Sequence, residues 1–249
     1  RVSGNVLQEL RYGVGKLIYA TPIYRYTLVG RAPSELAVVP PDPWPGNAER
    51  GAAISAGELS FLGETVRSGK HVWHPDGMGE AWRAELHSFD WLRDLRAVGG
   101  DAARRRARDL VRDWIDRQSS WQEIAWRPDV LATRLYAWLG QHDFFCSSAD
   151  DDYRRRYLAN IARQTKHLAR VLPGGVEGAG LIRAAKGLIV AGVALPDNES
   201  AVRQGLKTLE RAIDRQIRAD GGHISRDPET QATVLRDLVD VRSALLASD

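Results

Sequence analysis

The stretch Asp101–Gln118 reads DAARRRARDLVRDWIDRQ, and its apolar residues recur at the spacing of an amphipathic α-helix. They fall at i, i+4, i+7, i+8, i+11 and i+12, which are Ala103, Ala107, Leu110, Val111, Trp114 and Ile115. Gly99 and Gly100 precede the stretch, and Asp101 is a residue type that caps helices well. The spacing therefore predicts one helix with a single apolar face turned to the core.

The same period continues to the end of the chain. Asp129 is placed to cap a second helix that includes Leu131, Leu135, Trp138, His142 and Phe145 on one side. A third helix is expected from about residue 150 to the Pro173-Gly174-Gly175 stop. The segment 181–195 is apolar on nearly all sides, as in a helix enclosed by others, and two more helices are expected over 200–219 and 228–247. We therefore predict an all-α protein in which antiparallel helices are joined by short loops.

The first hundred residues are less regular. Apolar spacing over 6–17 predicts a helix weakened by two glycines, and the proline-rich stretch 40–45 must be extended. Residues 58–66 alternate as in a short strand or an irregular loop, and 87–97 are expected to be helical again. The expected domain organisation is an N-terminal helix and extended segment over 1–45, followed by one helical domain over 46–249.

Composition excludes several classes of function. The chain of 249 residues has 35 Lys and Arg against 32 Asp and Glu, a balance that does not indicate a nucleic-acid surface. One cysteine, Cys146, excludes a disulfide framework and a thiolate-rich metal site. The longest apolar run, 187–196, is about half of what a membrane span needs. His71 and His74 are the only closely spaced histidines, and the glycine pairs lack the strand-turn-helix context of a phosphate loop, so we expect neither a metal nor another cofactor.

Four segments in a fixed order resemble the helical domain of the heparinase II/III-like polysaccharide lyases. They are Pro43-Trp44, WRAELHSFDWL at 82–92, WRPDVLATRLYAW at 126–138 and DGGHISRDP at 220–228. The resemblance implies that 46–249 form an incomplete α/α toroid and that a β-sandwich domain, absent from this chain, follows in the full-length protein. It also implies an acidic polysaccharide or oligosaccharide as partner, with the β-sandwich as an intramolecular one, and a periplasmic or cell-envelope location. The chain begins at Arg1 without a visible signal peptide, so we expect it to be a piece of a longer protein.

The chemistry of that family is β-elimination at a uronate, which needs neutralisation of the C5 carboxylate, a base and an acid. The Asn-His pair of the family aligns with Ala179-Gly180 here, and its Tyr-His pair aligns with Thr230-Gln231. Two hypotheses follow. Either the protein acts on uronate polysaccharide with other residues, or it is a catalytically inert glycan-binding or scaffold module in cell-surface polysaccharide handling.

Candidate site residues come from the same segments. His223, in a glycine-rich turn where functional side chains are commonly displayed, is the candidate catalytic residue. Trp82 is a candidate stacking surface, Arg134 and Arg226 are candidate partners of a uronate carboxylate, and Gln231 stands where the family has histidine. The structural alternatives are that His223 bonds a helix end and that Arg134 ties helices together. We expect the turn 220–226 to lie on the rim of the main groove.

Overall fold

The computed structural model describes residues 12–30, 32–67, 69, 72–118 and 120–248, and these are mostly helical. Residues 12–19 form a helix, so the predicted 6–17 helix is seen in part, since 1–11 lie outside the described residues. The remaining elements are α2 (Pro22–Leu28), α3 (Ala48–Ser55), β1 (Glu58–Phe61), β2 (Glu64–Arg67), α4 (Glu80–Ser88), α5 (Leu92–Val98), α6 (Gly100–Gln118), α7 (Pro128–Gly140), α8 (His142–Cys146), α9 (Asp151–Val171), α10 (Gly178–Ala194), α11 (Glu199–Gln216) and α12 (Pro228–Leu246).

The long helices form where the apolar spacing predicted them. In α6 the buried residues include all six of the predicted apolar face. The carboxylates of Asp150 and Asp227 cap α9 and α12 by accepting hydrogen bonds from the backbone amides of Tyr153 at 2.7 Å and Thr230 at 2.8 Å. Pro228 is the first residue of α12, where its missing amide hydrogen costs nothing.

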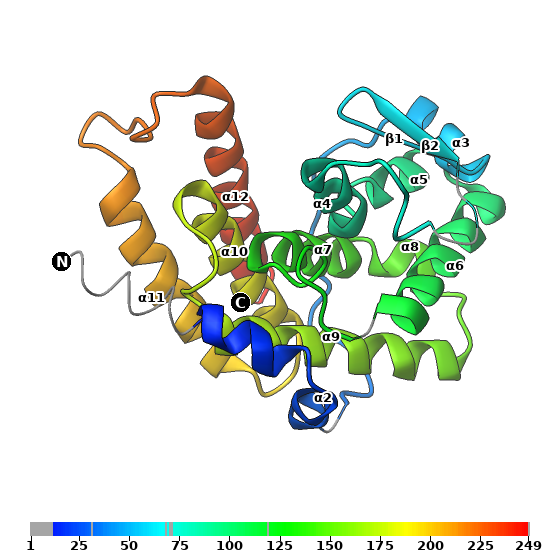
Figure 1. Cartoon of the computed structure of the whole chain (residues 1–249), viewed down its shortest axis with the longest axis horizontal. Helices are drawn as coiled ribbons and strands as arrows, with labels where there is room; N and C mark the ends of the chain where they lie inside the picture. Colours follow the sequence, from blue (N-terminus) through cyan, green and yellow to red (C-terminus); the bar gives the residue numbers. More distant parts are fainter. Residues whose placement is uncertain (1–11, 31, 68, 70–71, 119, 249) are drawn as a thin grey trace.

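The helices surround α10, which is apolar on nearly every side as predicted. It packs against α7, α9, α11 and α12. In Figure 1, α11 and α12 lie on one side of α7 and α10, while α3 to α6 and the β-hairpin lie on the other, with α9 along the base. A Cβ at Gly187 would lie 2.4 Å from the Cβ of Ala132, so the glycine permits the close approach of α10 to α7.

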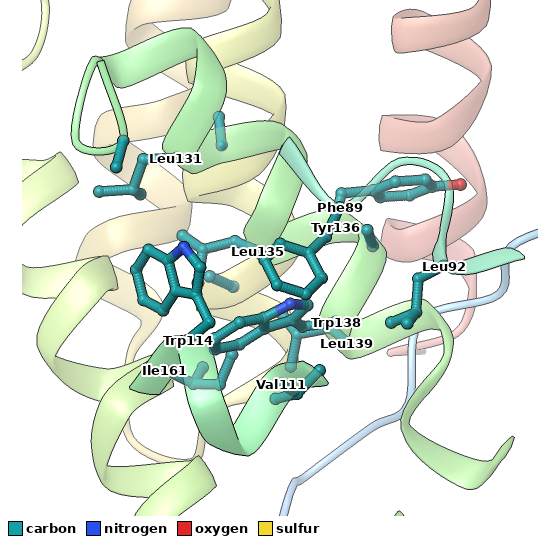
Figure 2. Packing of buried hydrophobic residues seen from close by; sticks show 14 of the residues in the cluster. Phe89, Leu92, Val111, Trp114, Leu131, Leu135, Tyr136, Trp138, Leu139 and Ile161 are labelled. Atoms are coloured by element: carbon teal, nitrogen blue, oxygen red, sulfur yellow. The ribbon is translucent and has the colours of Figure 1, made fainter. Parts of the chain in front are cut away.

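An aromatic cluster fills the core between α4, α6 and α7 (Figure 2). The rings of Trp114 and Trp138 meet edge to face with centroids 5.4 Å apart, and Phe89 meets Trp138 in the same way at 5.3 Å. All three side chains are fully buried. Edge-to-face pairs add about 0.5–1.5 kcal/mol beyond the area that they bury, so this cluster is a principal tie between the three helices.

Several predicted boundaries are wrong, each for a local reason. The helix expected over 87–97 breaks at Phe89, which adopts φ 57° to bury its ring. A left-handed residue costs about 1–2 kcal/mol, which burial of a whole phenyl ring offsets. The helix expected from Asp129 begins instead at Pro128 after Arg127, and it ends at Gly140 before α8. Helix α2 was not predicted, although Thr21 caps it and Pro22 opens it.

The alternating stretch 58–66 is a hairpin rather than a loop. Strands β1 and β2 pair antiparallel, with Phe61 opposite Glu64. Leu62 and Gly63 have φ values of 53° and 82°, as a tight two-residue hairpin turn requires. Apart from an isolated bridge between Ile217 and His223, this hairpin is the only β structure of the described residues, so the all-α prediction is confirmed as a fold class. No helix in the described ranges combines the length and the apolar character needed to cross a membrane.

Candidate functional site

A groove of about 360 Å³ lies between α4, α7, α10 and α12. Its described lining carries five acidic and five basic side chains, which are Glu85, Asp90, Asp129, Asp237, Asp240, Arg93, Arg127, Arg183, Lys186 and Arg236. The groove therefore has a high density of charge but no net excess of either sign.

The floor of the groove is a buried ionic network centred on Lys186. Its Nζ atom lies 2.5 Å from Asp237 Oδ1 and 2.9 Å from Asp240 Oδ2. Asp240 Oδ1 also accepts hydrogen bonds from the Tyr136 hydroxyl at 2.8 Å and from Trp44 Nε1 at 2.6 Å. Charges this deeply buried are stable only when paired and hydrogen-bonded, so the network fixes α7, α10 and α12 relative to the segment at residue 44.

Helical spacing explains how the sequence builds this floor. Arg183 and Lys186 stand three residues apart on α10, and Arg236, Asp237 and Asp240 stand at i, i+1 and i+4 on α12. Residues three or four apart share one face of a helix, so both helices turn a charged stripe toward the groove. In Figure 2 the Tyr136 hydroxyl points from α7 toward the α12 ribbon.

The wall of the groove offers hydrogen-bonding groups that the protein leaves open. The Arg236 guanidinium lies 4.5 Å from the centre of the Trp44 ring, is exposed, and has no carboxylate within 4.0 Å among the described residues. Arg183 Nε is 3.5 Å from Asp237 Oδ2, and that buried oxygen has no hydrogen-bond partner in the described part of the chain. A guanidinium stacked on a ring keeps its edge donors free for a planar oxyanion such as a carboxylate.

Tyr136 contributes to structure rather than to proton transfer. Burial of its side chain, followed by the nearby Asp240 carboxylate, raises the pKa of Tyr136 above its ordinary value. Its hydroxyl proton is already donated to Asp240. The phenol therefore stays protonated at neutral pH and holds the floor of the groove in place.

The positions that align with the family's catalytic pairs lie at the first turns of α10 and α12. A Cβ at Gly180 would lie 3.8 Å from the Cβ of Asp129, which lines the groove, so this position is at the groove's edge. The Thr230 hydroxyl donates to Asp227 Oδ2 at 2.5 Å as part of the helix cap. Gln231 Oε1 accepts from the His223 backbone amide at 2.6 Å.

The turn 220–226 is held by contacts within itself and with the end of α11 and the start of α12. His223 is 5% exposed. Its Nε2 atom lies 3.0 Å from Gln216 Oε1 and its Nδ1 atom lies 2.8 Å from Ser225 Oγ. Arg226 is exposed and its Nη1 donates to Asp220 Oδ2 at 2.9 Å. The structure thus brings His223 and Gln231 together, and His223 contacts the last residue of α11. As lined by the described residues, the groove includes neither His223, Arg226 nor Gln231, so their functional roles stay predictions.

Trp82 and Arg134 lie in the core. Trp82 is 1% exposed, packs edge to face against Phe61 and donates from Nε1 to the Glu64 carbonyl at 3.0 Å. Arg134 is fully buried, and burial lowers the pKa of its guanidinium. It donates to Gln164 Oε1 and to the His87 carbonyl, both at 2.8 Å, and stacks over Trp114. In this conformation neither side chain has a surface that a sugar could reach, and Arg134 ties helices together, which was the structural alternative.

The sequence analysis missed the groove residues because only a few isolated charged residues indicate them, rather than a recognisable motif. Arg183 and Lys186 are the two charged residues of an otherwise apolar helix, and a cation in such a helix is a sign of a buried ion pair. The run Arg236-Asp237 with Asp240 gives the matching carboxylates at helical spacing. Within the described residues no three His, Cys, Asp or Glu side chains converge as metal ligands, and His71 lies outside them.

Comparison with known proteins agrees with this architecture. The FtsZ-localized protein C of Caulobacter vibrioides is 31% identical over 217 residues, which are 86% of this chain and 37% of that protein. A solved heparinase III with methylated lysines superposes with a TM-score of 0.66 at 17% identity, over 81% of this chain and 36% of its own. The heparan sulfate lyase HepC of Pedobacter heparinus gives a TM-score of 0.62 at 17% identity, over 90% of this chain and 42% of its own.

The solved structures establish the toroid fold alone, and the chain spans only about two fifths of the length of these proteins. A family model described as the heparinase II/III N-terminus matches residues 68–246, well over half of the chain. The resemblance seen in the four sequence segments is thereby confirmed. The chain belongs to the heparinase II/III N-terminus family.

Proposed function

We propose that this chain binds a uronate-containing saccharide in the groove between α4, α7, α10 and α12 and does not cleave it by β-elimination. The observation that carries the proposal is which of the groove's side chains have free hydrogen-bond donors and which are already paired. Arg236 keeps its guanidinium edge open, while Lys186 and Tyr136 are committed to Asp237 and Asp240. The groove thus offers a carboxylate-binding group, while the Lys186 and Tyr136 side chains on its floor are already engaged and are not available for proton transfer.

The aligned catalytic positions support the same reading. Elimination needs a group that neutralises the C5 carboxylate and a base that removes the C5 proton. Ala179, Gly180, Thr230 and Gln231 hold neither a basic nor an acidic side chain at neutral pH. General acid-base groups typically contribute about 100- to 10,000-fold each, so a chain lacking both pairs is expected to be slower by several orders of magnitude.

The charge of the groove favours a sparsely charged saccharide. Its five basic and five acidic groups cancel, so a densely sulfated polymer meets as much repulsion as attraction. A saccharide with isolated carboxylates can place one at Arg236 or Arg183, which line the groove. We therefore expect oligouronates to bind more tightly than heparin-like chains.

The relatives fit a family in which one fold has more than one use. One is titled a heparan sulfate lyase, and another is named for its localization with FtsZ rather than for a reaction. The remaining alternative is a lyase whose chemistry comes from residues outside this chain, for example from the β-sandwich domain expected by resemblance. It is favoured by the limited share of the relatives' length that the chain spans.

Titration calorimetry with a galacturonate trisaccharide tests the proposal, with the absorbance of unsaturated uronate followed in the same samples. We expect binding without product, and about tenfold weaker binding by Arg236→Gln, since charge-assisted hydrogen bonds contribute about 1.5–3 kcal/mol. Arg242→Gln, an exposed position on the same helix outside the groove, serves as the matched control. Product formation by this chain would contradict the proposal, and so would equal binding by both variants.

A further inference from the structure

A second cavity, of about 1050 Å³, lies between α2, α9 and α11. None of its described lining residues belongs to the groove described above. In Figure 1, α2 lies below α9, on the side away from α4 and α12, so the two sites are on different faces of the molecule. A cavity of this size is at the upper end of the range for small-molecule clefts, and it can accommodate several residues of a peptide.

The charges on its wall do not cancel. Arg156 forms an ion pair with Asp116. Three further cations line the cavity, namely Arg25, Arg163 and Lys166, and within the described residues no carboxylate lies within 4.0 Å of any of them. Asp197 is the remaining acidic side chain of the described lining. Like charges gathered without counter-charges repel one another, and an anionic occupant would remove that repulsion.

Arg163 is the best-fixed of these cations. Its guanidinium carbon lies 5.7 Å from the centre of the Trp126 ring, and its Nε and Nη2 atoms are buried without hydrogen-bond partners among the described residues. Burial, together with the charge of Arg25, lowers the pKa of Arg163 to about 10. The side chain still lines the cavity, so a small shift of the guanidinium would let an oxyanion occupy its unused donors.

We propose that this cavity is a docking site for an acidic peptide segment with aliphatic side chains. Its lining alternates cations with apolar residues such as Leu28, Pro33 and Leu195, and none of its described members is aromatic. Saccharides and nucleobases are commonly held against flat aromatic rings, which this wall does not offer. Charge complementarity and an aliphatic surface fit a peptide that alternates carboxylates with branched or proline side chains.

Fluorescence anisotropy tests the proposal with the whole chain and a fluorescein-labelled ten-residue peptide of alternating Glu and Leu. The same peptide with Gln in place of Glu is the ligand control. We expect the Glu peptide to bind at least about tenfold more tightly, and Arg163→Gln and Lys166→Glu each to weaken it about tenfold. Lys166 is exposed, so its variant is expected to keep the fold, which thermal unfolding verifies.

Two protein controls localise the effect. Arg155→Gln removes an exposed arginine of α9 that pairs with Asp152 and does not line the cavity, and Arg236→Gln alters the groove. Both should bind the Glu peptide as the unmodified chain does. Equal affinity for the Gln peptide, or unchanged binding by Lys166→Glu, would overturn the proposal. Displacement of the peptide by inorganic phosphate or by phosphatidylglycerol vesicles at matched concentrations would assign the cavity to another anion and equally overturn it.

Discussion

Replacing Lys186 by methionine removes the cation that holds the floor of the groove together. In the folded chain Lys186, Asp237 and Asp240 are 5%, 3% and 2% exposed. Without Lys186 two carboxylates stay buried with Arg183 at 3.5 Å as the nearest remaining ion-pair partner of Asp237, while Asp240 keeps its bonds from Tyr136 and Trp44. Removing one partner of a buried ion pair costs about 3–5 kcal/mol, and the retained contacts place our expectation near the lower limit, at about 3 kcal/mol.

Urea unfolding followed by tryptophan fluorescence measures this loss. For a chain of this size about 1 kcal/mol moves the thermal midpoint by about 2–4 °C, so calorimetry should record a fall of roughly 6–12 °C. Arg155→Met breaks an exposed ion pair on α9 and should cost less than about 1 kcal/mol. The combined variant Lys186→Met, Asp237→Asn, Asp240→Asn removes the uncompensated charge and should recover part of the loss.

Two results would refute this reasoning about the floor of the groove. One is a Lys186→Met variant within about 1 kcal/mol of the parent chain, which would mean that the buried pairs contribute no more than surface ones do. The other is a combined variant less stable than Lys186→Met alone, because the penalty would then not come from unpaired buried charge.

Three further predictions concern stability and reactivity. Gly180→Ala should stabilise the chain by about 0.5–1 kcal/mol in urea unfolding because its Cβ would make only ordinary contacts, whereas Gly187→Ala, whose Cβ would lie 2.4 Å from another helix, should destabilise it. Burial lowers the pKa of His87 and of His167 to about 3 in the folded chain, so the unfolded chain takes up their protons first as the pH falls. Stability should therefore decrease from about pH 6.5 downward, by roughly 2 kcal/mol per histidine at about pH 5, and a urea midpoint unchanged between about pH 7 and pH 5 would exclude this linkage. Burial raises the pKa of the Cys146 thiol, so a thiol reagent should label it only on unfolding, and rapid labelling of the folded chain would contradict its placement.

Helical periodicity predicted the long helices well because each buries one continuous face. The apolar face of α6 and the all-round apolar character of α10 each depend on residues of one continuous segment. They can therefore be predicted from the sequence. The break at Phe89 could not be predicted, because its left-handed backbone is favoured only by the burial of its ring against side chains of other helices. Similarly, α7 and α8 separate at Gln141, whose side chain donates to Asp42, about a hundred residues earlier in the chain.

The candidate site was harder to predict than the fold. A motif match places Arg134 on a helix but does not say which way its side chain faces, and α7 is buried on nearly all sides, so Arg134 is drawn into the core. The network on the groove's floor joins Trp44, Lys186 and Asp240, which are far apart in the sequence and meet only when α7, α10 and α12 pack. One signal in the sequence was Lys186. A cation within an apolar helix indicates that buried carboxylates from another segment pair with it.

The most direct test of the central claim is a single titration of this chain with a galacturonate trisaccharide, in which heat and the absorbance of unsaturated uronate are recorded together. We predict saturable binding that Arg236→Gln weakens about tenfold and Arg242→Gln does not, with no product in any sample. Product that accumulates with this chain and disappears with Arg236→Gln would contradict the claim and make the groove a lyase site. The absence of binding would contradict it as well.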